Sequence, residues 1–439
     1  MPLDVTLESD FSPRKLRIVV VCLAGTMFGT YLVVFGALSW VMLPITQEFH
    51  WTRLQFSYAA SAMMWAGALA MPLLGRIADR FGVRIVTVLV TAILGGVTLL
   101  VARQAHVWSF CLCVALAGVF GQGRIIYEKV IAALFTRNRG KALSIFHILA
   151  TPIHALMPQI TTTLFTHFGW RRVFLAWGVV GLAVVPLLFF WLEEPGSVPG
   201  GSFGRAGLGR LAASQNSPAR LIGMTAGEAR KHRTFWLLVV MALFPNAIQI
   251  GWVQHHVAFL VGRGFTQSQV ANVISISFLF QPVALFLGGY VVDRARTSKI
   301  AAPFALLGAI GMWVEWMAWA NFGGIPLLLL GITLCALALG VALPIQTYFF
   351  TRYFGLKAFA EIYGLCLAIQ QLLSGFGPPL VGKIFDRTGS YNAAVLMLAM
   401  AYVLWAIVAL ILGPYRYSLD VHEKETPDIR EADSAPQPA

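Results

Sequence analysis

Charged side chains are scarce in this 439-residue sequence, and their scarcity excludes an ordinary soluble protein. Only 12% of the residues are charged, about half the usual soluble share, whereas 58% are hydrophobic. Acidic residues are scarcer than basic ones, at 19 against 32. The basic residues lie singly or in twos and threes between apolar runs, so they form no basic face of the kind that binds nucleic acid.

Cysteine is also rare, and its placement excludes a disulfide framework. The five cysteines all lie in apolar stretches, they are odd in number, and none shows C-x-x-C spacing: Cys22, Cys111, Cys113, Cys335 and Cys366. The sequence therefore predicts no metal site built on cysteine.

Enzyme motifs are missing. Neither H-E-x-x-H nor G-x-S-x-G occurs, and no two carboxylates share a face in the middle of an apolar run. The segment GPPLVGKI, which starts at Gly377, resembles a phosphate loop, but Ile384 stands where Ser or Thr is required. We expect no enzyme, no cofactor and no metal.

Long apolar runs are what the sequence has in abundance. A window of about 20 residues, the length of a helix that crosses a bilayer, finds twelve of them. They lie near residues 17–42, 54–74, 84–103, 108–135, 141–166, 171–192, 234–260, 268–290, 301–320, 325–350, 359–382 and 392–413. This pattern predicts an all-α membrane protein with twelve transmembrane helices in two six-helix halves. Because no cleavage site follows the first run, we expect it to remain as an anchor.

A segment rich in Gly, Ser, Pro and Arg separates the two sets of runs. We expect an N-terminal bundle over residues 1–192, a cytoplasmic linker over 193–233, a C-terminal bundle over 234–415 and a disordered tail over 416–439. Within the linker, Thr225 and Glu228 have the spacing of a capping box, which predicts a short helix before the seventh span.

The basic residues predict the orientation of the chain. With the N-terminus inside, 23 of the 32 Lys and Arg residues fall on the cytoplasmic side and 7 on the outer side. The remaining 2, Arg124 and Lys129, lie within the fourth run. The excess of positive charge in the cytoplasmic segments accounts for the basic composition without any nucleic-acid partner.

The two halves repeat each other. A shift of the chain by 214 residues aligns Trp51-Thr52 with Phe265-Thr266, Gln55 with Gln269, Ser61 with Ser275, Gly75 with Gly289, and Asp79-Arg80 with Asp293-Arg294. Two similar six-helix units in one orientation are typical of a transporter whose halves rock about a site near the middle of the membrane.

The segment GRIADRFGVR, residues 75–84, joins the second and third runs and resembles the loop signature of the major facilitator superfamily. We predict a conformational latch made of Gly75, Asp79, Arg80, Arg84, Asp293 and Arg294. In this interpretation Gly75 permits close helix contact, and Asp79 accepts from a helix N-terminus or pairs with an arginine. The alternative is a charged turn that only fixes topology.

Further segments resemble the branch of that superfamily with the oxalate/formate antiporters and monocarboxylate porters. They are EFHWTR, FTRNRGKAL, FGWRRVF, YFGLKAFAEIYG and GKIFDRTGSY. The resemblance implies alternating access and a small organic anion as substrate. The sequence departs from that branch in its uncharged eighth run, in Gln370 and Gln371 where some relatives carry Lys, and in Pro152 and Pro158 of the fifth run.

Three charges in the fourth run require an explanation, because each is costly inside a membrane. At about 100° per residue, one helical stripe contains Ala117, Gly121, Arg124 and Glu128, with Tyr127 beside it and Lys129 facing elsewhere. One interpretation is a static Arg124–Glu128 pair that fixes helix packing. In the other, Arg124 faces a cavity, a substrate carboxylate competes with Glu128, and the released Glu128 takes up a proton.

Other polar residues within the runs are candidates for the same site. His147, Thr151 and His154 share one face of the fifth run, where they line a cavity, relay protons or only pack. His255 and His256 are adjacent, so they diverge on a helix and are unsuited to a shared metal. The candidate substrate-binding residues are Arg124, Tyr127, Tyr31, His154, Gln249, His255 and Gln370, and those for proton coupling are Glu128 and His147. Glu315 is expected to have a packing or interfacial role, because the ninth span of this superfamily is usually peripheral.

Together these patterns predict a monomeric secondary active transporter in a bacterial cytoplasmic membrane, with both termini inside. Its partners are the lipid bilayer, a small organic anion and protons. The alternatives are a drug or metabolite exporter of the same fold, a membrane sensor that has lost transport, and a membrane-embedded transferase.

Overall fold

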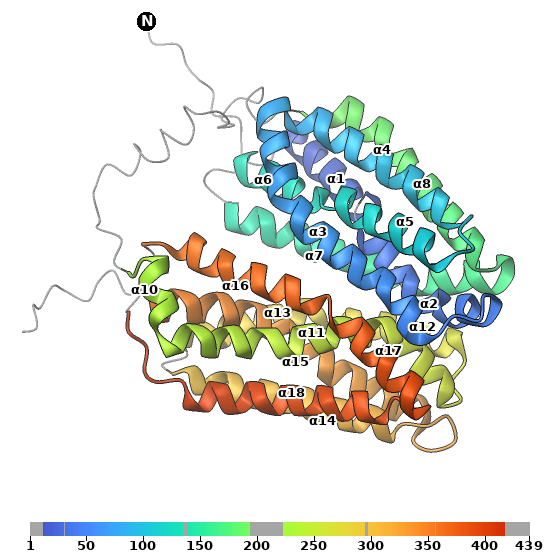
Figure 1. Ribbon diagram of the computed structural model, residues 1–439. Helices are drawn as coiled ribbons and strands as arrows, with labels where there is room; N and C mark the ends of the chain where they lie inside the picture. Colours follow the sequence, from blue (N-terminus) through green and yellow to red (C-terminus); the bar gives the residue numbers. More distant parts are fainter. Residues whose placement is uncertain are drawn as a thin grey trace, which may run out of the picture.

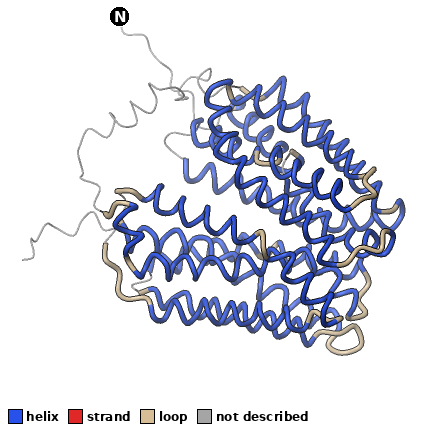
Figure 2. The backbone as a smooth tube through the Cα atoms, in the orientation of Figure 1, coloured by secondary structure: helices blue, strands red, loops and turns tan. Residues whose placement is uncertain are grey.

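The structure is a computed structural model, and it describes residues 12–29, 31–134, 139–193, 223–294, 297–355 and 357–417. In this part of the chain almost all of the regular structure is helical, and the β-bridges are isolated pairs that form no sheet (Figure 2). The helices form two bundles that meet along one side, as Figure 1 shows. The predicted all-α architecture is confirmed.

Each predicted apolar run coincides with one helix or with two in succession, so the twelve predicted spans are confirmed. The N-terminal bundle contains α1 (Pro13–Phe28), α2 (Tyr31–Glu48), α3 (Arg53–Phe81), α4 (Val83–Val101), α5 (Val107–Phe120), α6 (Gly123–Leu134), α7 (Arg139–Phe168) and α8 (Trp170–Trp191). The C-terminal bundle contains α10 (Ala226–Lys231), α11 (Arg233–Gly262), α12 (Gln267–Phe278), α13 (Gln281–Arg294), the 3-10 helix η2 (Ser298–Ile300), α14 (Ala301–Met317), α15 (Gly324–Phe354), α16 (Phe359–Ser374), α17 (Gly377–Thr388) and α18 (Asn392–Ile411).

The outer faces of the bundles suit lipid rather than water. Within the described residues, nine helical segments are long and apolar enough to cross a membrane, and the other three predicted spans lie on α5 with α6, on α7 and on α11. Large apolar side chains such as Trp108, Phe190 and Phe286 are exposed on these faces. Such a surface would promote aggregation in water, but it is matched to the hydrocarbon interior of a bilayer.

The fourth span is interrupted just before its charged residues. It consists of α5 and α6, and the helix breaks at Gly121 and Gln122. Glycine lowers the cost of leaving the helical conformation. The prediction of one continuous stripe from Ala117 to Glu128 is therefore wrong, because the break separates Ala117, buried in the core, from Arg124 and Glu128 on α6.

The internal repeat is visible in how the helices begin. At the start of α3, Thr52 and Gln55 form a reciprocal capping box, and at the start of α12 the equivalent Thr266 and Gln269 form another. Each box satisfies two backbone donors that a helix N-terminus leaves unpaired. The predicted relation between the two halves is thus confirmed at the level of single hydrogen bonds. The predicted box of Thr225 and Glu228 is also present, at the start of α10.

The two sides of the molecule differ in how the bundles approach each other. We call one side the terminal side: it holds the start of α1, the end of α8, the start of α11 and the end of α18. The opposite side holds the connections from α2 to α3 and from α17 to α18. On the opposite side α17 packs against α3 and α12 against α7. Toward the terminal side the bundles diverge, at the left of Figure 1.

An ion-pair cluster ties the first and last helices of the N-terminal bundle on the terminal side. Arg14 Nε lies 2.8 Å from Oε2 of Glu193, and Arg17 Nη2 lies 2.7 Å from Oε1. The hydrogen bond from Arg14 holds the pKa of the Glu193 carboxyl below its usual range. The cluster closes this end of the N-terminal bundle, so the divergence on this side lies between the bundles and not within one of them.

Candidate functional site

A cavity of about 460 Å³ is shared by the two bundles. Its walls come from α1, α2, α6 and α7 on one side and from α11, α12, α13, α14, α15 and α18 on the other. The volume falls in the usual range for small-molecule sites, about 300 to 1,000 Å³. Most lining residues are apolar, and the polar ones include Arg124, Gln249, His256, Ser277, Gln281 and Glu315.

Arg124 brings a positive charge to this cavity. Its Nε donates to Oε1 of Glu128 at 2.7 Å, one turn further along α6. The terminal amino groups of its guanidinium have no hydrogen-bond partner among the described residues. Two parallel N–H groups of this kind match the two oxygens of a carboxylate.

The Arg124–Glu128 pair is placed to rearrange. The two side chains are 44% and 32% exposed, and pairs of such exposure contribute at most about 1 kcal/mol to stability. Lys129 is not among the lining residues of the cavity, as its predicted position on another face of α6 requires.

A second, smaller cavity of about 260 Å³ adjoins the first in the C-terminal bundle. Side-chain amides dominate its polar lining: Asn246, Gln249, Gln281, Gln346 and Gln370. Gln249 and Gln281 line both cavities, and Gln370 Nε2 donates to the Ala242 carbonyl at 3.1 Å. The predicted residues Gln249 and Gln370 thus reach cavity walls, and their role toward a substrate stays a prediction.

Tyr127 does not line either cavity, so its prediction as a substrate-binding residue is wrong. Its side chain is fully buried in the N-terminal bundle. Gly25 makes room for the ring, because a Cβ atom at this position would lie 2.4 Å from Tyr127 Cζ. The hydroxyl lies 3.3 Å from Oγ1 of Thr91, which supplies the hydrogen bond that a buried tyrosine needs.

Of the two adjacent histidines, the structure turns His256 and not His255 toward the large cavity. His255 is fully buried, and its Nε2 lies 2.9 Å from Ser57 Oγ and 3.2 Å from the Pro378 carbonyl. Its Nδ1 lies 3.1 Å from the Tyr391 hydroxyl. The prediction of His255 as a substrate-binding residue is wrong, because this side chain joins the two bundles instead.

Glu315, for which we expected a packing or interfacial role on a peripheral span, instead reaches the wall of the large cavity. It is buried on α14, it lines the large cavity, and its Oε1 contacts Nε2 of His256. The sequence carried a signal that could have found this pair. A carboxylate within an apolar run marks a functional candidate by default, with a partner to be named.

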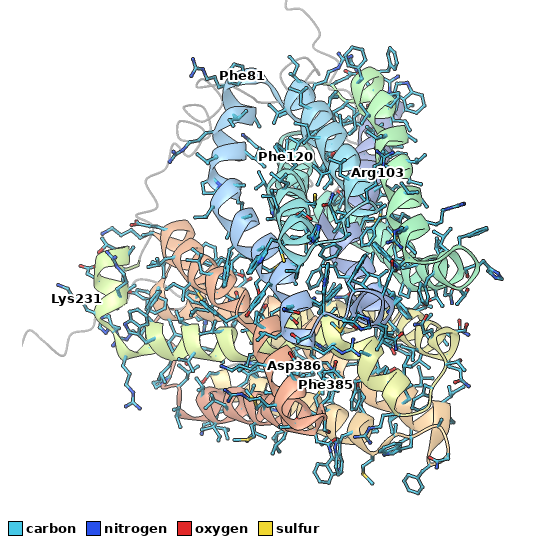
Figure 3. The ribbon with its side chains drawn as sticks, turned by 45° about the vertical axis from the view of Figure 1, so that its right-hand side comes forward. Phe81, Arg103, Phe120, Lys231, Phe385 and Asp386 are labelled. Atoms are coloured by element: carbon cyan, nitrogen blue, oxygen red, sulfur yellow. The ribbon has the colours of Figure 1, made fainter. Side chains whose placement is uncertain are left out.

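The bundles are joined on the opposite side by a carboxylate that the sequence analysis missed. Asp386 of α17 accepts from the backbone N–H groups of Arg53 and Leu54, at 3.0 and 2.9 Å. Figure 3 shows Asp386 on α17 beside the start of α3. Gly382 lets the helices approach, since a Cβ atom there would lie 2.9 Å from the Arg53 carbonyl oxygen. The first two donors of α3 are thus capped from the other bundle.

The predicted latch residues lie on the terminal side, where the bundles diverge. A Cβ atom at Gly75 would meet open space, so the expectation that this glycine permits close helix contact is wrong in this conformation. Arg80 and Arg84 place their guanidinium groups over the rings of Phe81 and Phe189, at 5.4 and 5.0 Å. The latch itself stays a prediction.

Several predicted side chains lie outside the described residues. They are those of Tyr31, Asp79, His147, Thr151, His154, Asp293 and Arg294. Their backbones belong to α2, α3, α7 and α13, and their roles remain predictions.

Two pseudo-symmetric helix bundles that share a central cavity are typical of secondary transporters. The sequence profile of the Major Facilitator Superfamily matches residues 18–312 and 257–437. The chain belongs to the major facilitator superfamily, as its resemblance predicted. It is a transporter and not an enzyme.

The comparisons extend over most of the chain. It is 22% identical over 414 residues to the 2-nitroimidazole transporter of Escherichia coli K12, covering 91% of this chain and 96% of that protein. It is 22% identical over 458 residues to the gallate transporter of Pseudomonas putida, covering 94% and 98%. It is 25% identical over 378 residues to the 3-(3-hydroxy-phenyl)propionate transporter of Escherichia coli K12, covering 84% and 87%.

Solved structures share the fold at lower identity. A D-xylose-proton symporter matches with a TM-score of 0.71 at 15% identity, covering 91% of this chain and 98% of that one. A bacterial homolog of the human lysosomal transporter Spinster matches with a TM-score of 0.71 at 16% identity and the same coverage, 91% and 98%. These likenesses show the fold.

Proposed function

We propose that this transporter moves a small organic anion through the shared cavity, and that Arg124 binds its carboxylate. The observation that carries the proposal is the guanidinium of Arg124, which lines the cavity with its terminal amino groups unpaired among the described residues. Arginine grips a carboxylate at two points and keeps its charge at any physiological pH. A neutral drug would accept hydrogen bonds from this group but would gain no charge pairing.

The amide-lined wall favours an anion that also carries hydroxyl groups. Amide side chains both donate and accept hydrogen bonds, so Asn246, Gln249, Gln281 and Gln346 suit phenols or alcohols. Two similar transporters are named for gallate and for 3-(3-hydroxy-phenyl)propionate, which combine a carboxylate with ring hydroxyls. We therefore place hydroxylated aromatic acids first among the candidate substrates, and proton coupling as the source of energy.

The test is binding, followed by transport. We expect gallate or 3-(3-hydroxyphenyl)propionate to raise the melting temperature of the purified protein, and the methyl esters of these acids to raise it much less. The same acids should exchange across proteoliposomes that contain the protein. A panel of hydroxylated, plain aromatic and aliphatic acids that neither stabilises the protein nor crosses the membrane would refute the proposal.

The first prediction concerns orientation. We propose that the terminal side faces the cytoplasm of a bacterium, since six of the 32 basic residues lie within residues 193–233. A reporter enzyme inserted in that linker should be active only in the cytoplasm, and one inserted after Arg103 only outside. Reversed activities at the two sites would overturn the orientation.

The second prediction concerns the latch. Asp79→Asn should slow transport several-fold without loss of membrane insertion, because it removes one charge from the end of α3 and not from the middle of a span. Initial rates and the amount of inserted protein would be measured together. Arg76→Gln, one turn earlier on the same helix, is the matched control. Equal rates for wild type and Asp79→Asn would reduce this loop to a topology signal.

A further inference from the structure

A second ionisable pair lines the large cavity, and the proposed function has not used it. Nε2 of His256 on α11 contacts Oε1 of Glu315 on α14. The two side chains are 12% and 2% exposed, so this pair is far less accessible to water than the Arg124–Glu128 pair. It nevertheless belongs to the wall of the same cavity.

The packing around Glu315 fixes its position. Gly331 of α15 allows close approach, because a Cβ atom there would lie 2.7 Å from the Glu315 backbone nitrogen. Two other titratable groups, Cys335 on α15 and Tyr402 on α18, line the same cavity as Glu315, and Arg263 follows the end of α11. His256 is the one hydrogen-bond partner of the Glu315 side chain within the described residues.

Arg263 does not neutralise Glu315 directly. Its guanidinium donates to the Trp316 carbonyl at 2.6 Å and to Asn392 Oδ1 at 3.1 Å, and it lies 4.1 Å from the centre of the Trp319 ring. The carboxylate therefore depends on His256. An unpaired carboxylate in an apolar span is costly, whereas the pair with one added proton carries no net charge.

We propose that the His256–Glu315 pair is the proton-binding site of this transporter. A proton enters from water in the cavity, is held between Nε2 and the carboxylate, and leaves again to water; no other bond forms or breaks. The two charges of the Arg124–Glu128 pair cancel, so an anion bound at Arg124 adds one negative charge to the cavity. The proton on the His256–Glu315 pair cancels it.

This inference rests on the proposed function, because it assumes that the proton crosses the membrane together with an organic anion. It differs from the sequence-based hypothesis that Glu128 takes up the proton. Glu128 is a third exposed and already paired with Arg124, so solvent and the guanidinium stabilise its charge. Glu315 is almost fully buried and has no arginine partner among the described residues, so protonation stabilises it more than it stabilises Glu128.

The first test needs no substrate. Purified protein in weakly buffered detergent is taken from about pH 8 to about pH 5, the window in which histidine changes charge, and the protons taken up are counted with an indicator dye. Glu315→Gln should take up about one proton fewer than wild type, because the pair has lost its carboxylate and His256 its anion. Glu128→Gln, the same change at the carboxylate that is paired with Arg124, should equal wild type. His256→Gln replaces Glu315→Gln if that variant does not fold.

The second test separates this proposal from the proposed function. Proteoliposomes with an imposed pH gradient and labelled gallate should show accumulation with wild type and with Glu361→Gln, which changes an exposed carboxylate at the start of α16, outside both cavity linings. Glu315→Gln should still exchange gallate but fail to accumulate it. Accumulation by Glu315→Gln, or proton uptake equal to wild type in the first test, would overturn the proposal. Failure of wild type to move any acid would refute the proposed function, while the proton count would still decide the role of the pair.

Discussion

Arg124→Lys is expected to weaken gallate binding about ten- to a hundredfold. Lysine keeps the charge but lacks the planar fork that meets both carboxylate oxygens. A hydrogen bond to a charged group contributes about 1.5 to 3 kcal/mol, and each 1.4 kcal/mol is a factor of ten in affinity. Binding would be measured by calorimetry, with methyl gallate as the matched uncharged ligand whose affinity should not change.

Two further variants separate a binding role of Arg124 from a purely structural pair. Glu128→Gln should bind gallate as well as wild type or more tightly, because the internal competitor for the guanidinium is gone. If the pair only fixes helix packing, each single change should destabilise the protein, and the double variant Arg124→Met, Glu128→Leu should recover stability. Transport of gallate by that charge-free double variant would contradict the assignment of Arg124 to the substrate.

Asp386→Ala is expected to shift the molecule toward opening on the opposite side about two- to thirtyfold. Asp386 caps the first two donors of α3 from the other bundle. Loss of a helix cap costs about 0.5 to 2 kcal/mol, and here the cost falls only on the conformation in which the bundles touch. When the two bundles of the wild type separate, water must hydrate the two backbone N–H groups and the Asp386 carboxylate instead.

The shift would be measured as a distance distribution between spin labels at Arg103 and Asn321, in a background without the five native cysteines. Both positions are exposed loops on the opposite side, one in each bundle. Arg387→Gln, a neighbouring charge change on α17, is the control and should leave the distribution unchanged. An unchanged distribution for Asp386→Ala as well would show that closure depends on the apolar helix contacts alone.

Local patterns predicted the elements of the fold well. Run lengths located the twelve spans, and the spacing of Thr225 and Glu228 predicted a capping box that forms as expected. The repeat of Thr52 and Gln55 at Thr266 and Gln269 also became two equivalent helix starts. These features depend on residues within a few positions of each other, which a sequence displays directly.

The candidate site was predictable only in part, because periodicity does not fix how a helix is rotated within a bundle. Helical periodicity does not distinguish His255 from His256 as the residue that faces the cavity. Packing between the helices turns His256 toward the cavity and His255 toward Ser57. Tyr127 was misplaced for the same reason. Asp386 was missed because its partners are backbone groups that lie 332 and 333 residues away along the chain.

The neutrality of the Arg124–Glu128 pair has an electrical consequence. While no anion is bound, the net charge of the pair is zero. A membrane potential therefore exerts no net force on the pair when the cavity opens to one side of the membrane or to the other. A bound anion without a proton would add one charge, on which each 100 mV acts with about 2.3 kcal/mol if it crosses the whole field. A carrier that takes one proton with each anion moves no net charge per cycle, so it responds to the pH difference and the anion gradient and not to the voltage.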